Sequence, residues 1–174
     1  MNDLQYSFLA SATAEAIKAN HPFAMMAASE AALESNWGNS ELARVAFNLF
    51  GMKQHSHPNP GFGTLNLPTR EFENGEWIVV PGADWVKYPD WRACFCDRLA
   101  TLERLSNIYP HYKAALDAKD PITYVTEVSQ TWSTDPQRAA KVISIYQDYL
   151  AVWKQQMTPP PSDTAPPSTP GSGQ

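Results

Sequence analysis

The sequence predicts an α+β domain that is mainly helical and carries one small β-hairpin lobe. Three observations support this prediction. Apolar residues recur at helical spacing near the N-terminus and again between residues 136 and 155. Asn74-Gly75 separates two apolar stretches, and Asn-Gly is a strong hairpin signal because both central positions of a type I′ turn need positive φ. Prolines also stand near the start of several expected helices.

Two helices and a short third one are expected before residue 46. Pro22 is well placed as the first residue of the second helix, over about 22–36, which is rich in Ala and Met and ends before Gly38. Ser40 is the expected N-cap of the short helix, which reaches about Val45. The first helix covers about residues 3–19, with an apolar stripe formed by Leu4, Phe8, Leu9, Ala12 and Ala16.

The hairpin and four more helices follow in the second half of the chain. The expected strands are Leu67–Phe72 and Glu76–Val80. Proline also lies near a helix start at Tyr88-Pro89, and in Asp120-Pro121 and Asp135-Pro136 the Asp supplies an N-cap oxygen. The expected helices are 90–108, 110–117, 121–131 and 136–155, and the last packs on the core through Ala139, Val142, Ile143, Tyr146 and Leu150.

Composition limits the domain organisation and the classes of partner. Residues 1–156 fit one globular domain, and residues 157–174 are rich in Pro, Ser and Thr, as in a linker or an extended tail. The net charge of −5 disfavours a nucleic-acid partner. Cys94 and Cys96 would point about 200° apart around a helix, which disfavours a disulfide between them. We expect a monomer.

Two features bear on where the protein acts. The N-terminus has neither the basic nor the apolar segment of a Sec signal peptide. No apolar run approaches the roughly 18 residues that a membrane span needs. A protein that acts outside the membrane would then need another export route, such as a holin, a secretion system or a larger parent protein, and the sequence leaves these alternatives open.

Glu34 is the first candidate for catalytic chemistry. It closes an otherwise small and apolar helix, just before Trp37 and Gly38. A carboxyl held against an aromatic and apolar wall is desolvated and stays protonated near neutral pH. A protonated carboxylic acid is what a glycosidic oxygen requires as it leaves, although the same pattern also fits a solvent-facing Glu at a helix end.

Several motifs resemble the glucosaminidase domain of glycoside hydrolase family 73. Residues 31–40 (AALESNWGNS) and 47–53 (FNLFGMK) are similar to two motifs of that family, in the same order. Residues 69–75 (TREFENG) are similar to its hairpin, and residues 132–136 (WSTDP) resemble its "Y-A-T-D-P" segment. The resemblance covers about residues 20–150. It implies a lysozyme-like fold with a cleft between the helical lobe and the β-hairpin lobe.

The resemblance also implies roles for individual residues. Glu34 matches the general acid of the family, and Glu71 matches a second acidic residue in the β lobe that acts on the opposite face of the sugar. Asn48 and Phe50 match a segment that lines the cleft floor, although this segment could also be only a structural turn. Trp37, beside Glu34, is a further candidate for contact with the substrate.

Trp132 departs from the family pattern, because a tyrosine stands at the matching position. An indole can stack on a sugar ring and donate an N–H, but it cannot supply a phenol. Trp132 therefore either keeps only a binding role or reflects a different substrate position. Glu73 is a second carboxylate on the same strand face as Glu71, and Glu71 is chosen because it matches the family motif.

The resulting hypothesis is an endo-β-N-acetylglucosaminidase that hydrolyses peptidoglycan glycan strands between N-acetylglucosamine and N-acetylmuramic acid. Either Glu71 activates water or the 2-acetamido group of the substrate attacks the anomeric carbon. No cofactor or metal is required, and His55 and His57 are more typical of an exposed loop than of a metal site. The alternatives are a lytic transglycosylase or muramidase on the same fold, and a non-catalytic wall-binding module.

Overall fold

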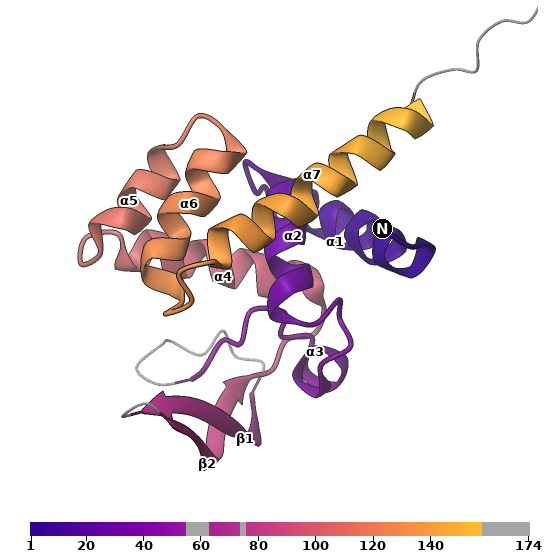
Figure 1. The fold of residues 1–174 in the computed structure, drawn as a ribbon. Helices are drawn as coiled ribbons and strands as arrows, with labels where there is room; N and C mark the ends of the chain where they lie inside the picture. Colours follow the sequence, from indigo (N-terminus) through magenta and orange to yellow (C-terminus); the bar gives the residue numbers. More distant parts are fainter. Residues whose placement is uncertain (55–62, 74–75, 158–174) are drawn as a thin grey trace, which may run out of the picture.

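The computed structural model describes residues 1–54, 63–73 and 76–157, with the backbone alone described at 69–73 and 77. This part of the chain contains seven helices and one two-stranded antiparallel sheet, which confirms the mainly helical α+β class (Figure 1). Residues 158–174 of the expected tail at 157–174 lie outside the described residues, as do His55 and His57. In chain order the elements are α1 (Asp3–Lys18), α2 (Ala24–Glu34), α3 (Glu41–Ala46), β1 (Thr64–Glu73), β2 (Glu76–Val86), α4 (Trp91–Leu105), α5 (Pro110–Asp117), α6 (Pro121–Trp132) and α7 (Arg138–Met157).

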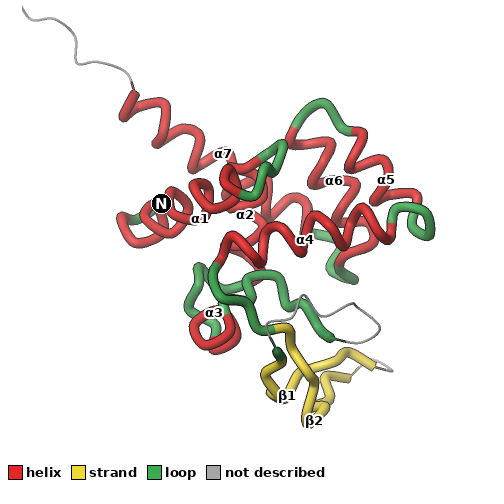
Figure 2. Tube along the Cα trace, turned by 180° about the vertical axis from the view of Figure 1, so that it is seen from behind, coloured by secondary structure: helices red, strands yellow, loops and turns green. Residues whose placement is uncertain are grey.

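Helix α2 lies at the centre of the helical body, where it packs against α1, α6 and α7 (Figure 1). Its alanines let these neighbours approach closely, and four of them, Ala27, Ala28, Ala31 and Ala32, are at most 1% exposed. The hairpin and α3 lie together on one side of this body (Figure 2). Within the described ranges, no helix combines the length and apolar character needed to cross a membrane.

Helix starts follow the capping rules in most places, but the second and the last helix each begin two residues later than predicted. Ser40 caps α3, and Asp120 caps α6 with Pro121 as its first residue, both as predicted. The prediction that Pro22 begins the second helix is wrong, because the Phe23 N–H is held by the His21 ring and α2 starts at Ala24. Pro89 lies near the start of α4 as predicted, and the Asp90 side chain caps this helix by accepting from the Ala93 N–H.

The last helix begins two residues later than predicted and extends further. The Asp135 side chain accepts from the Gln137 N–H, and the first helical residue of α7 is Arg138. The helix continues to Met157, one residue past the predicted end of the domain. Val142 on the predicted stripe is fully buried, so the stripe does face the core.

The hairpin is longer than the sequence pattern indicates. Strand β1 pairs with β2 from Thr64 opposite Val86 to Glu73 opposite Glu76. A register shift between Leu67 and Thr69 divides the ladder, where Pro68 has no N–H to donate to a partner strand. The predicted Asn74-Gly75 turn falls outside the described residues, although the paired strands on either side of it are antiparallel as expected.

His21, three residues before the start of α2, is a buried titratable group. The residue is 7% exposed, its Nδ1 accepts the Phe23 N–H at 3.1 Å, and its Nε2 lies 3.1 Å from the Tyr124 hydroxyl. Because Nδ1 is an acceptor, the ring proton belongs on Nε2. Burial lowers the His21 pKa to about 4, with Arg98 adding to the decrease and Glu30 opposing it.

Replacing His21 by Asn keeps an acceptor for Phe23 but removes the titrating ring. Since the pKa is 6.5 unfolded and about 4 folded, the unfolded chain binds more protons between these pH values. The contribution of His21 to the free energy of unfolding is fully present above pH 6.5. It is lost as pH falls toward 4, by on the order of 3 kcal/mol. Urea unfolding across this range should show wild-type stability falling toward that of the variant. Parallel pH dependences for the two proteins would contradict the assignment.

Candidate active site

Glu34 is the last residue of α2, and the chain turns sharply after it. Asn36, Trp37 and Gly38 all adopt left-handed backbone conformations, with φ of 51°, 58° and 75°. The Ser35 hydroxyl donates to the Ala31 carbonyl and accepts from the Gly38 N–H, which fixes this turn. The ESNWG segment thus stops the helix, and the predicted helix end at residue 36 moves back to Glu34.

The same turn carries Trp37 toward α1. Its ring lies edge-on to Phe8, with centroids 6.4 Å apart. A Cβ at Gly38 would lie 2.9 Å from Phe8, so glycine is required both by this contact and by its φ. Trp37 also lines a cavity of about 360 Å³ with Asn2, Leu4, Gln5 and Asn39, a group that does not include Glu34.

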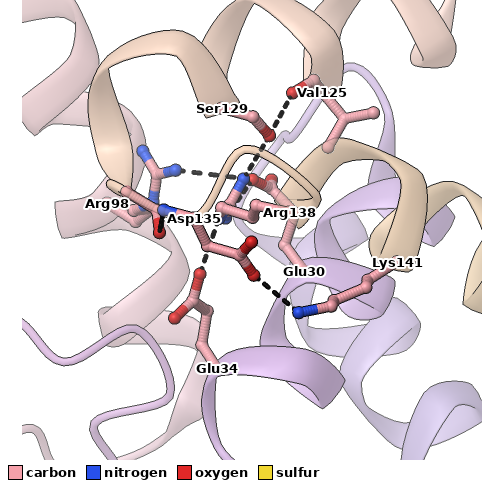
Figure 3. Close-up of polar contacts among 9 residues, drawn as sticks. Glu30, Glu34, Arg98, Val125, Ser129, Asp135, Arg138 and Lys141 are labelled. Carbon is pink, nitrogen blue, oxygen red and sulfur yellow. Dashed lines mark hydrogen bonds and ion pairs between the residues drawn. The ribbon is translucent and has the colours of Figure 1, made fainter.

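Arg138 joins Glu34 to the interior. The residue is 1% exposed. Its guanidinium donates to Glu34 Oε1 from Nε at 2.7 Å, to Ser129 Oγ from Nη1 at 2.8 Å and to Glu30 Oε1 from Nη2 at 2.9 Å (Figure 3). These acceptors come from α2 and α6, while Arg138 begins α7. One side chain therefore ties three helices together at the candidate acid.

The surroundings of Glu34 differ from the apolar wall expected from the sequence. The residue is exposed at the helix end, but its side chain is only 25% exposed and one oxygen faces a guanidinium. Burial alone would lower the Arg138 pKa, but the carboxylates of Glu30 and then Glu34 raise it above its ordinary value. Arg138 is therefore a permanent positive charge beside the candidate acid.

Trp132 lies at the end of α6 and is partly exposed. The guanidinium carbon of Arg98 sits 3.4 Å from the centroid of its ring, in a cation–π contact. The Arg98 side chain is 2% exposed, and its Nη2 is 3.5 Å from Glu30 Oε1. One face of the indole is thus occupied by a buried arginine that the same Glu30 carboxylate holds.

Asn48 and Phe50 are parts of the interior in this structure. Asn48 is 1% exposed, donates to the carbonyls of Met52 and Val86, and accepts from the Met52 N–H. Phe50 is 3% exposed and packs edge-on against Phe95. Asn48 fixes the NLFG turn through these hydrogen bonds, whereas Phe50 packs into the interior. The contact of either residue with substrate stays a prediction.

The backbone of Glu71 lies in β1 opposite Ile78. Only the backbone of this residue is described, so its expected role as the second acidic residue stays a prediction.

Cys94 is a buried free thiol whose pKa is raised by burial to about 12, and Cys96 is free and exposed. Across the described ranges, no cluster of three or more His, Cys, Asp or Glu side chains is arranged to hold a metal ion.

Residues 10–151 match the Glucosaminidase family, described as mannosyl-glycoprotein endo-beta-N-acetylglucosaminidase. The chain belongs to the glucosaminidase family. This domain is similar to the exo-glucosaminidase LytG of Bacillus subtilis, with 30% identity over 74% of the chain and 45% of the relative. It is also similar to a probable N-acetylmuramidase of Lactococcus lactis subsp. cremoris, with 31% identity over 74% of the chain and 29% of the relative.

A solved structure of the same architecture supports the lysozyme-like fold of the glucosaminidase domain. The catalytic domain of the autolysin Auto from Listeria monocytogenes has a TM-score of 0.72 and 23% identity, over 88% of each chain. The chain thus spans most of that catalytic domain, but less than half the length of the two curated relatives. The glycoside hydrolase class expected from the sequence agrees with the family match.

Sequence reasoning missed Glu30, Arg98 and Arg138. A signal was present for Glu30, because Glu30 and Glu34 are four residues apart on α2 and therefore share a helix face. A Glu in a run of alanines that becomes the core of the domain needs a buried cation as a partner. Arg98 and Arg138 lie 68 and 108 residues from Glu30 in the sequence, so only the fold could identify them as that partner.

Removing Arg138 should strongly destabilise the glucosaminidase domain. Arg138→Met removes the closer of the two cations beside buried Glu30 and leaves the more distant Arg98, and loss of one partner from a buried ion pair costs about 3–5 kcal/mol. Lys141→Met, one turn further along α7, breaks only the exposed pair with Asp135 and should cost less than about 1 kcal/mol. Urea unfolding of the two variants measures this difference. Similar losses in both would show that the buried network is not a major stabilising interaction.

Proposed function

We propose that the glucosaminidase domain hydrolyses the β-1,4 bond between N-acetylglucosamine and N-acetylmuramic acid in peptidoglycan, with Glu34 as proton donor. The observation that supports this most directly is the placement of Glu34. Its carboxyl lies at a helix end, accepts a hydrogen bond from the buried Arg138 through one oxygen and is still partly exposed to solvent. The names of relatives, including an exo-glucosaminidase and an autolysin, support the same substrate class.

Arg138 gives the two oxygens of Glu34 different tasks in this proposal. Oε1 accepts from Arg138 Nε at 2.7 Å, which leaves Oε2 to carry the proton. Oε2–H donates to the glycosidic oxygen as the bond from that oxygen to the anomeric carbon breaks. The carboxylate that results is stabilised by the neighbouring guanidinium, a charge that is already in place and needs no reorganisation.

Two routes complete the reaction. In the first, Glu71 takes a proton from water, whose oxygen attacks the anomeric carbon from the face opposite Glu34 and inverts its configuration. In the second, the acetamido oxygen of the substrate attacks first, and water then opens the cyclic intermediate with net retention. Trp132, stacked on Arg98 at one face, serves as an aromatic platform for a sugar ring in either route.

The relatives also favour a second candidate, because one of them is a probable N-acetylmuramidase. A muramidase or lytic transglycosylase would cleave the neighbouring bond and leave N-acetylmuramic or anhydro-muramic ends. A wall-binding module would bind glycan without cleaving it. We further propose action on the cell wall as a monomer, with export by a holin, a secretion system or a longer parent protein.

Glu34→Gln should abolish wall lysis while preserving the fold. The amide oxygen of Gln can still accept from Arg138, but the side chain has no acidic proton, so turnover should fall at least about 100-fold. Loss of turbidity of purified peptidoglycan measures the rate. Glu127→Gln serves as the control, because Glu127 is a partly exposed residue of α6 that pairs with His111 of α5. Mass spectrometry of the wild-type products should show new reducing N-acetylglucosamine ends. Near wild-type activity in Glu34→Gln would overturn the mechanism, and anhydro-muramic products would identify a transglycosylase.

Glu71→Gln distinguishes the two routes. If Glu71 activates water, turnover should fall at least about 100-fold, whereas Glu73→Gln, two residues further along β1, should stay near wild type. NMR of freshly formed product should then show inversion at the anomeric carbon. A Glu71→Gln variant that keeps its rate and yields a retained anomer would instead assign the attack to the acetamido group.

A further inference from the structure

A chain of charged side chains runs beneath the candidate site and joins its two best-placed residues. Glu34 contacts Arg138, Arg138 contacts Glu30, Glu30 contacts Arg98, and Arg98 stacks on Trp132. The three inner members, Glu30, Arg98 and Arg138, are each at most 2% exposed. Only the two ends, Glu34 and Trp132, reach solvent.

Glu30 is the centre of this chain. Its Oε1 is 2.9 Å from Arg138 Nη2 and 3.5 Å from Arg98 Nη2. With 1% exposure it cannot contact a polymeric substrate itself. Burying one carboxylate and two guanidiniums is costly, and an apolar cluster of similar volume is often at least as stable. The arrangement therefore calls for a role beyond holding the helices together.

The two arginines are used in ways that lysine could not reproduce. Arg138 donates from three nitrogens to acceptors on two helices, which requires the planar fork of a guanidinium. Arg98 packs through its flat face and pairs with Glu30 by charge: among the described residues, none of its three guanidinium nitrogens has a hydrogen-bond partner, and the ion pair from Nη2 to Glu30 Oε1 is 3.5 Å long. Its plane lies against Trp132 at 3.4 Å, with the ring of Phe50 at 5.4 Å.

We propose that Arg138 and Arg98 are positioning residues of the glycosidase, Arg138 for the proton donor Glu34 and Arg98 for the aromatic platform Trp132, with buried Glu30 fixing both. This inference rests on the function proposed above. The two arginines have separate roles. Arg138 sets the orientation of the acid Glu34 and hence kcat, whereas Arg98 sets the position of the Trp132 ring and hence KM.

Conservative variants test this division with soluble, uncross-linked glycan strands as substrate. Arg138→Lys keeps a positive charge but loses the fork, so kcat should fall about 100-fold, as expected for a misplaced catalytic group, with KM little changed. Arg98→Lys loses the stacking plane, so KM should rise several-fold while kcat stays within about twofold of wild type. Glu30→Gln keeps the size and shape of the central side chain but removes its charge. It should therefore both lower kcat and raise KM.

Val142→Ala is the matched control for stability. Val142 is a fully buried residue of the same helix as Arg138 and has no polar side-chain contact to Glu34, so its truncation should lower Tm while both constants stay near wild type. If Arg138→Lys and Arg98→Lys instead change kcat and KM no more than Val142→Ala at equal folded fraction, the network is only structural and the proposal is overturned. This result is distinct from failure of the proposed function, which would appear as activity in Glu34→Gln.

Discussion

The ion pair between Arg138 and the two glutamates of α2 is the interaction on which the candidate site depends. Glu30 and Glu34 lie one turn apart on the same face of α2, and Arg138 spans them from the first residue of α7. Ser129 on α6 takes the third donor. Because the guanidinium is buried and each of its three nitrogens donates to a fixed acceptor, the relative positions of three helices and the acid are set together.

This arrangement explains why the interior of a small domain contains so much charge. Glu30 and both arginines lie in an interior that is otherwise built mainly from apolar and aromatic side chains. Buried ionic groups of this kind contribute little net stability compared with an apolar core. They do impose a single geometry, since any shift leaves a charge without its partner, and a glycosidase needs its acid held in one orientation.

The departures from the family motifs have a physical context in the structure. An indole replaces the expected phenol at Trp132, and the face of that indole is supported by the guanidinium of Arg98. In the NLFG segment, which matches the family motif, Asn48 forms hydrogen bonds with the backbone before and after the hairpin. Trp37 and Gly38, which also match, form the turn that ends the helix at Glu34, and both lie against Phe8. These motif residues thus have a role in the fold.

Local signals in the sequence were enough to determine the helices, the hairpin and the position of Glu34 at a helix end. Those signals act over a few residues, as with the Asp120 cap or the apolar stripe through Val142, and the structure differs from them mainly in where elements begin and end. The tertiary structure alone decided which groups surround Glu34. Glu30, Arg98 and Arg138 meet through contacts between residues far apart in the chain, and whether a carboxyl faces an apolar wall or a guanidinium depends on that packing rather than on its neighbours in sequence.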